Sequence, residues 1–368
     1  MGYFLAKWWG SMDNEVTVYF RLNKDTKKKY AEYCNEYYEI ENVVFKPIFI
    51  DYDIYSFILF PLILYNILKI SLDIMKKNYD VIHYNSVPID IAILLPLISH
   101  FKNSYQTMTI HGAIFADKKY HFFKKIIMLQ KSFFNRIIVL NDYSKKLAIE
   151  AGFNECQLNE ISNGIEMEFI EKAQKKSLQG SPVILFVGVL TKNKAVDVVI
   201  KAVFEIVKSY NKVMLYIVGD GPEKKILNRL ILNMNLQDHI TFTGFIPTSD
   251  VFSYYKSADV LVLSSYEENF SITILEAMAS KTLVVVSDAP GNLSIVKSEK
   301  NGFVFPRGDY RTLASLIIKN LSDKKNLNTI IENAYNEIKE SYTWKVIAHK
   351  YEKVFKELII NEEKRTYV

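Results

Sequence analysis

Short apolar runs alternate with longer segments of helical apolar spacing in the first half of the chain. Strands separated by helices of roughly 10–20 residues favour βαβ units, in which helices cover both faces of a parallel sheet. The strand-like runs are Val16–Phe20, Val43–Ile50, Val81–Tyr84, Tyr105–Ile110 and Arg136–Leu140. The helical segments cover residues 24–37, 54–77, 88–101, 118–134 and 142–151.

The second half repeats this alternation after a polar segment, Gln174–Pro182, which contains glycine and proline and is the best linker candidate. We therefore predict an α/β protein with two Rossmann-like parallel-sheet domains, residues 1–173 and 181–342, that face a cleft. The strand-like runs of the second half are Val183–Val187, Val213–Val218, Ile240–Phe242, Val260–Leu263 and Leu283–Val286.

The composition supports a globular protein large enough for two cores, since 49% of the 368 residues are apolar and 24% are charged. Its two cysteines, Cys34 and Cys156, are far apart and form neither a zinc motif nor a disulfide framework. The opening run Met1–Lys7 is too short for a signal peptide. We expect a reducing, cytoplasmic compartment.

Basic residues are concentrated between Lys102 and Lys146, where nine lysines and arginines face only Asp117 and Asp142. Within this region, residues 118–134 mix basic and aromatic side chains over a helical length. Such a segment could contact an anionic membrane, or it could be a core-facing helix with a solvated basic side. Nucleic acid is not expected, because no nucleic-acid-binding motif accompanies the patch.

The most apolar stretch of the chain is Ile54–Ile74. Its uncharged run, Phe57–Leu68, is shorter than the roughly 20 apolar residues of a membrane span and contains Pro61 and Asn66. We interpret it as a buried or interfacial helix.

Several strand-like runs end in glycine, histidine or glutamate. Ligands of parallel α/β sheets bind beyond the carboxyl ends of the strands, so these positions are candidates for a site. The glycines after Val218 lack the third glycine of a dinucleotide-binding fingerprint, which argues against NAD. The strand-end candidates are His111, Gly188, Gly219, Gly244 and Glu268.

The segment Ser264–Ala279 reads as a loop followed by a helix, with Glu268 in the loop and Glu276 eight residues later on the helix. Asn269 and Ser271 are acceptable N-caps, and the free N–H groups of the first turn could bind an anion such as a diphosphate. The alternative is a capped surface helix with two solvated glutamates.

This segment resembles the E-x7-E signature of retaining nucleotide-sugar glycosyltransferases of family 4, which have the GT-B fold. The resemblance extends over most of the chain and implies that a last helix, residues 343–368, packs back on the first domain. The similar motifs include Thr109–Gly112, Ser162–Glu166, Val218–Pro222, Ser265–Phe270, Leu275–Ala279 and Asn301–Pro306.

The resemblance implies a catalytic set of Glu268, Lys194 and His111. Lys194 would contact the donor diphosphate, Glu268 the hydroxyls of the transferred sugar, and His111 would lie on the acceptor side. A cation at Lys194 would stabilise the charge that develops on the leaving group.

The same resemblance implies a donor site without a required cofactor or metal, for a UDP- or GDP-sugar. Glu276 would hold the ribose. Asp51 and Asp53 resemble a metal motif of another glycosyltransferase fold, but they lie in the wrong domain for this architecture. The other donor-binding residues would be Gly188, Gly219, Gly244, Phe245, Ile246, Asn269, Phe270, Ser271, Ile272 and Thr273.

The sequence departs from the family pattern at some positions. Val189 stands where many members have an arginine, and losing such a charge-assisted contact costs about 1.5–3 kcal/mol unless Lys192 substitutes. Lys281, Leu283 and Ser294 also replace usual residues, which looks like local tuning.

The segment Leu5–Val18 aligns with the first helix and second strand of the family, so the first strand and its glycine-rich loop are missing. We expect an exposed sheet edge and an incomplete acceptor and phosphate site. Either a segment upstream of Met1 supplies them, which we favour, or the protein is impaired.

We therefore expect a retaining hexosyltransferase that acts on a glycan or lipid-linked acceptor in cell-envelope assembly, at the cytoplasmic face of the membrane. The alternatives are a nucleotide-sugar epimerase on the same fold and a catalytically impaired sugar-nucleotide-binding protein.

Overall fold

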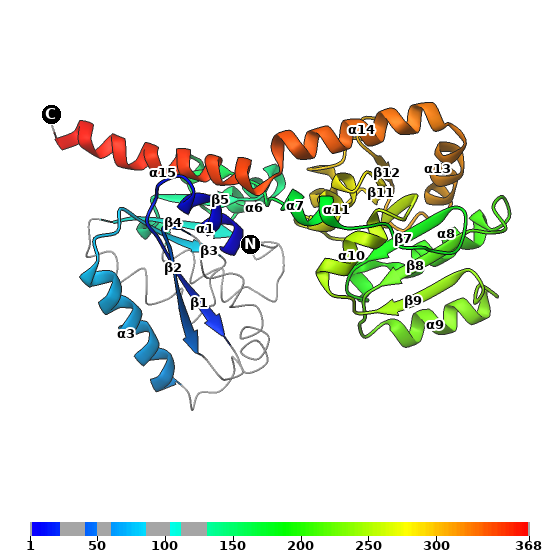
Figure 1. Ribbon diagram of the computed structural model, residues 1–368, viewed down its shortest axis with the longest axis horizontal. Helices are drawn as coiled ribbons and strands as arrows, with labels where there is room; N and C mark the ends of the chain where they lie inside the picture. Colours follow the sequence, from blue (N-terminus) through cyan, green and yellow to red (C-terminus); the bar gives the residue numbers. More distant parts are fainter. Residues whose placement is uncertain (1, 23–40, 50–59, 86–103, 112–130, 367–368) are drawn as a thin grey trace. The chain divides into compact units, whose positions relative to one another are not determined.

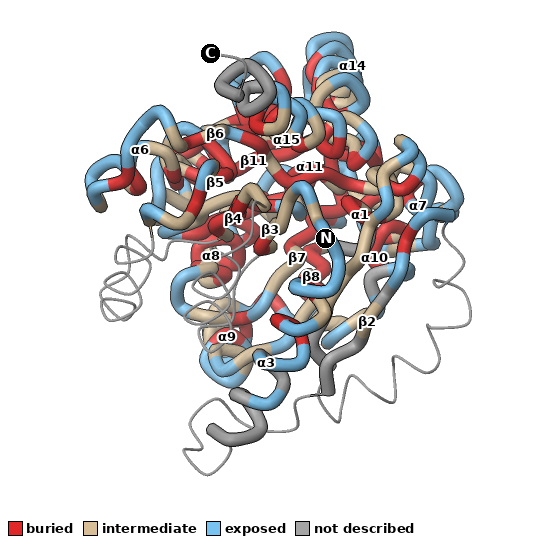
Figure 2. The backbone as a smooth tube through the Cα atoms, turned by 90° about the vertical axis from the view of Figure 1, so that its left-hand side faces the viewer, coloured by how far each residue is buried: buried red, intermediate tan, exposed pale blue. Residues whose placement is uncertain are grey.

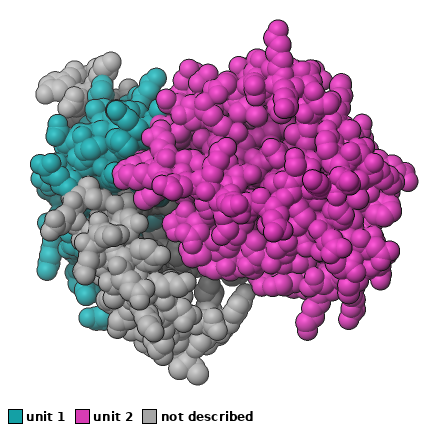
Figure 3. All heavy atoms as spheres, turned by 45° about the vertical axis from the view of Figure 1, so that its right-hand side comes forward, with its two compact units in different colours: residues 1–162, 344–368 teal, residues 163–343 magenta. Residues whose placement is uncertain are grey.

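The computed structural model describes residues 2–22, 41–49, 60–85, 104–111 and 131–366. The chain forms two compact units, shown in different colours in Figure 3. The first contains residues 1–162 and 344–368, and the second contains residues 163–343. The helix α15 (Trp344–Thr366) thus belongs to the first unit, although it follows the whole second unit in sequence.

The second unit is built on a six-stranded parallel sheet with the order β12-β11-β10-β7-β8-β9. Numbered along the chain from β7, this is the 3-2-1-4-5-6 order of dinucleotide-binding folds, whose topological switch point lies between β7 and β10. The strands are β7 (Val183–Val187), β8 (Met214–Val218), β9 (Ile240–Gly244), β10 (Val260–Leu263), β11 (Leu283–Ser287) and β12 (Phe303–Phe305).

Helices cover this sheet and explain why its strands are almost uniformly apolar, since such strands are buried on both faces. All four side chains of β10 and all five of β11 are buried, as Figure 2 shows for β11. The helices are α7 (Met167–Lys172), α8 (Val196–Ile206), α9 (Lys224–Asn233), α10 (Thr248–Tyr255), α11 (Ile272–Ala279), α12 (Pro290–Leu293), α13 (Tyr310–Ser322) and α14 (Lys324–Ser341).

The first unit contains two separate parallel sheets, β1-β2 and β3-β4-β5-β6 (Figure 1). Among the described residues, β1 and β3 are end strands of their sheets. The strands are β1 (Val16–Leu22), β2 (Val43–Phe49), β3 (Val81–Asn85), β4 (Tyr105–Ile110), β5 (Arg136–Val139) and β6 (Leu158–Glu160).

The described helices of the first unit are α1 (Gly2–Gly10), α3 (Phe60–Lys76), α6 (Asp142–Glu150) and α15. Helix α15 packs on α1 through a cluster that includes Leu5, Trp344 and Tyr351, and the rings of Phe4 and Trp344 stack with centroids 6.0 Å apart. No helix of the described residues is long and apolar enough to cross a membrane.

The predicted α/β class with Rossmann-like parallel sheets is confirmed, and each of the ten expected strands has a counterpart. The three-residue strands β6 and β12 were not predicted, because such short runs carry no periodicity. The expected helices at 24–37 and 88–101, and nearly all of 118–134, lie outside the described residues.

The unit boundary lies at residues 162 and 163, ahead of the predicted linker. Ile165 and Ile170 belong to the core of the second unit, and Ile165 bridges to Thr343 there. Residues 163–173 are therefore part of the second unit, because α7 packs on α10 and α11.

Candidate functional site

Two turns at the carboxyl ends of β7 and β10 bring Lys194 and Glu268 together in the second unit. The 3₁₀ helix η5 (Lys192–Lys194) follows β7, and Ala195 adopts a left-handed conformation (φ 48°) before α8 begins. The Nζ atom of Lys194 donates to Oε2 of Glu268 at 2.6 Å. These side chains are 26% and 14% exposed, so the pair is partly shielded from water.

The side chain of Asn193 fastens the two turns to each other. Its Nδ2 donates to the carbonyl of Glu267 and its Oδ1 accepts from the N–H of Glu267, both at 2.9 Å. The backbone N–H of Tyr266 also donates to the carbonyl of Asn193 at 2.8 Å. Three hydrogen bonds thus fix the separation between the Lys194 turn and the Glu268 loop. Asn193 was not predicted from the sequence, because nothing in a lone asparagine indicates a partner 74 residues away.

Hydrogen bonds from Ser264 and Gly291 also hold the Glu268 loop in place. The hydroxyl of the buried Ser264 donates to the carbonyls of Lys194 and Ala195, at 2.8 and 2.9 Å. The N–H of Gly291 donates to the carbonyl of Glu268 at 2.9 Å. A Cβ atom on Gly291 would lie 2.4 Å from that carbonyl oxygen, so only glycine permits the approach.

Helix α11 begins directly behind this loop, with Ser271 as its N-cap. Ser271 thus occupies the N-cap position that the sequence predicts for it, but its side chain makes no capping hydrogen bond. Asn269 does not occupy the cap position. The first N–H groups of α11 are therefore available to an acceptor on a ligand.

Glu276 lies one turn further along α11 and accepts a hydrogen bond from Tyr255 Oη at 2.9 Å. Desolvation by burial raises the pKa of Glu276 to about 7, and the bond from Tyr255 opposes this shift. Tyr255 is fully buried, and Thr273 also contacts its hydroxyl. The alternative of two solvated glutamates is wrong, because both Glu268 and Glu276 have shielded side chains.

Glycines bring the neighbouring strand ends close to one another. Gly219 (φ 135°) follows β8, and a Cβ atom there would lie 2.0 Å from the carbonyl oxygen of Gly188 after β7. The N–H of Gly219 donates to the carbonyl of Gly244 at 2.9 Å, and Gly244 also has a positive φ of 73°. The ends of β7, β8 and β9 thus form a continuous backbone edge without intervening side chains.

Large apolar side chains border this edge. Phe245 is 78% exposed after β9, whereas Ile246 is half-buried against the core. Phe270 is half-buried and its ring lies 6.5 Å from that of Tyr342. Ile272 is 38% exposed in the first turn of α11. Phe245 is thus a large flat ring that is free for contact with a ligand.

Arginine 307 is a further member of the site that the sequence analysis missed. Arg307 Nε donates to Asp288 Oδ1 at 2.9 Å, and its Nη1 donates to the carbonyl of Tyr266 at 3.1 Å. It therefore braces the Glu268 loop from the end of β12. Val189, at the position of the expected arginine, is 58% exposed, and Lys192 beside it is also exposed.

In the first unit, His111 follows β4 and its Nε2 lies 2.7 Å from Oδ1 of Asn85 at the end of β3. Because an amide oxygen accepts, Nε2 carries the proton and Nδ1 is left as an acceptor. Nδ1 has no hydrogen-bond partner among the described residues. Burial lowers the pKa of His111 to about 4, so the ring is neutral at pH 7.

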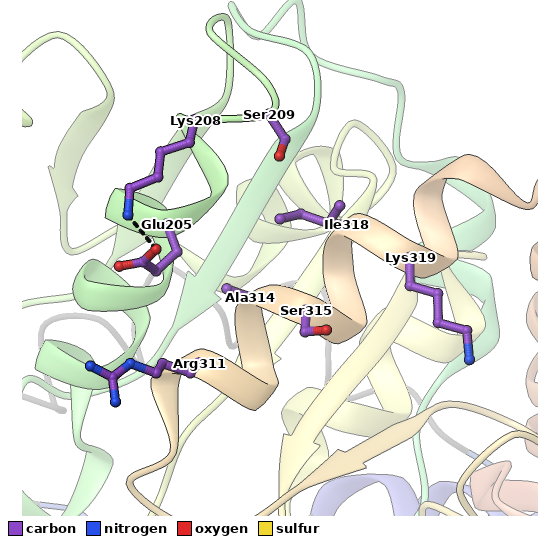
Figure 4. A pocket seen from close by; sticks show the side chains of 8 residues that line it. All are labelled: Glu205, Lys208, Ser209, Arg311, Ala314, Ser315, Ile318 and Lys319. Atoms are coloured by element: carbon purple, nitrogen blue, oxygen red, sulfur yellow. Dashed lines mark hydrogen bonds and ion pairs between the residues drawn. The ribbon is translucent and has the colours of Figure 1, made fainter.

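The described residues contain no group of three or more side chains suited to a metal ion, and Asp51 and Asp53 lie outside them. A shallow hollow near the carboxyl-terminal end of α8 contains none of the strand-end residues (Figure 4). It is lined by Glu205, Lys208, Ser209, Arg311, Ala314, Ser315, Ile318 and Lys319. The candidate site is therefore not this hollow but the edge at the switch point.

The chain is similar to known glycosyltransferases. Residues 168–337 match the family model described as glycosyl transferases group 1. Two uncharacterized glycosyltransferases of Methanocaldococcus jannaschii are 37% identical over 174 residues and 30% identical over 256 residues. These alignments cover 47% and 67% of this chain, and the chain spans only 44% and 64% of those relatives.

A third relative is the UDP-Gal:alpha-D-GlcNAc-diphosphoundecaprenol alpha-1,3-galactosyltransferase of Escherichia coli, 25% identical over 81% of this chain and 79% of its own length. Among solved structures, Anabaena Alr3699/HepE in complex with UDP is similar with a TM-score of 0.77 and 18% identity. That comparison covers 97% of this chain and 96% of HepE, and HepE has also been solved with UDP-glucose. The predicted GT-B fold class is confirmed by these neighbours.

Proposed function

We propose that the protein is a retaining glycosyltransferase that moves a sugar from a nucleotide-diphosphate sugar to a glycan or lipid-linked acceptor. The observation that carries this proposal is the Lys194–Glu268 pair at the switch point of the second unit, next to the start of α11. A cation, a carboxylate and free helix N–H groups within one edge suit a ligand with an anionic diphosphate and sugar hydroxyls.

In this proposal, the diphosphate binds Lys194 and the N–H groups at the start of α11. The segment Asn269–Thr273 lines the passage between phosphate and sugar, and Glu268 accepts hydrogen bonds from hydroxyls of the transferred sugar. Donor binding then replaces the direct ion pair between Lys194 and Glu268. Before the donor binds, this ion pair holds the two side chains next to each other. Lys194 stabilises the negative charge on the departing diphosphate.

The nucleoside would lie along the glycine edge formed by Gly188, Gly219 and Gly244. Glu276 would accept hydrogen bonds from ribose hydroxyls, and the exposed ring of Phe245, beside Ile246, would contact the base. The UDP and UDP-glucose bound by HepE support a nucleotide-sugar donor, and uridine donors are the first to test. GDP-sugars remain within the proposal.

On the acceptor side, His111 would offer its unprotonated Nδ1 to a hydroxyl near the transferred sugar. The E. coli relative named for a diphosphoundecaprenol substrate supports a lipid-linked or glycan acceptor. The proposed setting is assembly of cell-envelope glycans at the cytoplasmic face of the membrane.

The proposed reaction retains the anomeric configuration by attack from the face that the phosphate leaves. The bond from the anomeric carbon to the phosphate oxygen breaks, and the bond to the acceptor oxygen forms on the same face. The acceptor proton passes to the departing phosphate oxygen, so no protein nucleophile is required. Lys194 offsets the charge on the phosphate during this step.

The epimerase alternative is not favoured, because the relatives named above are glycosyltransferases. The impaired-protein alternative rests on Val189 and on the expected absence of the first strand. It predicts that donors bind without sugar transfer. Incubation with donor alone distinguishes the epimerase, which would convert the sugar without an acceptor.

The test of the donor site is thermal unfolding against UDP-, GDP- and ADP-sugars, with Glu276→Ala as the site variant. A donor at about 100 times its Kd adds about 2.7 kcal/mol and raises Tm by a few degrees. Glu267→Gln is the matched control, because the Glu267 side chain is exposed and only its backbone contacts Asn193. A shift with one nucleotide that persists in Glu267→Gln and disappears in Glu276→Ala supports the proposal. No shift with any donor contradicts it.

A further inference from the structure

Helix α3 presents an apolar stripe to solvent on the first unit. Tyr65, Leu68 and Leu72 are 61%, 48% and 52% exposed. Their spacing of three and four residues places them on one side of the helix, one turn after another. Single exposed apolar residues are common on protein surfaces, but an aligned series on one helix is a contiguous patch that fits a partner.

The opposite side of α3 is fixed to the protein, so its orientation is determined. Ile70 and Ile74 are 6% and 4% exposed and pack in the core of the first unit. Asp73 accepts hydrogen bonds from Tyr19 of β1 and Lys46 of β2, which tie the helix alongside that sheet (Figure 1). The exposure of the stripe therefore does not result from a detached helix.

Cations flank the stripe. Lys69 and Lys76 are exposed, and helical geometry places them beside Leu72 on the outward side. Asp73 is the single acidic residue of α3, and it is engaged by Lys46 and Tyr19. The outward side thus combines an apolar stripe with positive charge, the pattern of helices that lie in the plane of a membrane surface.

We propose that α3 docks the first unit onto an anionic lipid surface, with Tyr65, Leu68 and Leu72 inserted among the acyl chains. Lys69 and Lys76 would reach the headgroups with their charged ends. A second copy of the chain fits less well, because antiparallel pairing of two helices centred on this stripe would bring the two copies of Lys69 together. Only the role of this docking rests on the proposed function, since docking would bring the enzyme to a lipid-linked acceptor.

The proposal assigns membrane contact to a different element from the basic and aromatic segment 118–134, which lies almost wholly outside the described residues. It takes up one of the two expectations for Ile54–Ile74, which the sequence predicts to be a buried or interfacial helix and not a span. The two segments make different predictions, because substitutions in α3 leave 118–134 unchanged.

The experiment is flotation of the full chain with vesicles of phosphatidylcholine, with and without phosphatidylglycerol. We expect binding to the anionic vesicles that weakens with salt. The double variant Leu68→Gln/Leu72→Gln should bind about tenfold or more weakly, because it removes two inserted apolar side chains. Lys69→Gln/Lys76→Gln should lose about fivefold per lysine, corresponding to about 1 kcal/mol each.

The matched control is Ile226→Gln/Leu232→Gln on α9, where two apolar side chains are 54% and 56% exposed in the second unit. It makes the same chemical change away from α3 and should bind like the wild type. Circular dichroism and Tm confirm that each variant folds, as expected for exposed positions.

Three results would overturn the proposal. They are no binding by the wild type, wild-type binding by Leu68→Gln/Leu72→Gln, or a dimer in light scattering that this variant disperses without a change in lipid binding. The vesicle assay needs no nucleotide sugar, and the donor assay needs no membrane. A failure of this inference is therefore distinguishable from a failure of the proposed function.

Discussion

The two units differ in how their parallel strands are arranged into sheets. In the second unit, six parallel strands form one sheet around a single large core, and β10 is buried along its whole length. In the first unit, the described strands fall into two sheets, and β3 is half-buried at four of its five positions. The proposed donor site thus lies on the more continuous scaffold, since Lys194 and Glu268 follow its central strands.

The largest expected effect is a difference in stability between the units. Leu261 in β10 is fully buried, and Leu261→Ala should destabilise the second unit by about 2–5 kcal/mol. Val18 in β1 is half-buried, and Val18→Ala should cost about 1 kcal/mol or less. Urea unfolding can separate the units, because Trp8, Trp9 and Trp344 all lie in the first one.

We expect tryptophan fluorescence of the wild type to change at lower urea than far-ultraviolet circular dichroism, which both units contribute to. Leu261→Ala should shift the second transition while the fluorescence transition stays in place. If the two transitions coincide in the wild type and shift together in the variant, the units unfold as one. The difference between their sheets would then cause no difference in stability between the units.

The next largest effect concerns catalysis at the switch point. Lys194→Ala should lower kcat for sugar transfer by about 10²–10³-fold, because it removes the cation beside the leaving phosphate. Glu268→Gln should also lower the rate strongly while leaving Tm nearly unchanged. The control is Lys192→Ala, because Lys192 is exposed and lies two residues away in the same turn. An equal loss in Lys192→Ala would show that Lys192 replaces the arginine absent at Val189.

A smaller effect should appear in the pH dependence of donor binding. Burial raises the pKa of Glu276 to about 7, and ribose hydroxyls donate to its ionised form. Donor affinity should therefore fall as the pH drops from 8 to 6 in the wild type and stay level in Glu276→Gln. Tyr255→Phe removes a bond that lowers this pKa, so its midpoint should move to higher pH.

The raised pKa of Glu276 also determines how the stability of the fold changes with pH. The pKa of Glu276 is higher in the folded state than in the unfolded chain, so ionisation penalises the fold as the pH rises from about 4.5 to 7. Glu276→Gln should consequently gain stability over the wild type above pH 7 and lose this advantage at pH 4. His111, with a pKa of about 4, adds no titration between pH 6 and 8. An unchanged pH profile in Glu276→Gln would contradict this assignment.

The smallest effect is expected at Asn193. Asn193→Ala removes two partly exposed hydrogen bonds to Glu267, each worth about 0.5–1.5 kcal/mol. Donor affinity should fall several-fold, because Lys194 and Glu268 are no longer held at one separation. Asn193→Asp keeps the bond from the Glu267 N–H and should lie between Asn193→Ala and the wild type. Calorimetric titration with the donor measures both, and equal affinity in all three proteins would limit Asn193 to loop stability.

The sequence predicted much of the fold because strands buried on both faces read as continuous apolar runs, whatever their partners. It also predicted the candidate site in outline. Glu268 and Glu276 are local in sequence, and the glycines at the carboxyl ends of β7, β8 and β9 mark the edge where parallel strands end. These features depend on local chain geometry, and local pattern is sufficient to find them.

Only the tertiary structure determines which residues far apart in the sequence come into contact. Three contacts connect residues whose spacing in the sequence does not relate them. They are the ion pair of Lys194 with Glu268, the hydrogen bonds of Asn193 with Glu267, and the hydrogen bond from Tyr255 to Glu276. The strand order decides these contacts, because β10 adds beside β7 and not beside β9. Desolvation, which sets the pKa of Glu276, likewise depends on the packed surroundings and not on the glutamate itself.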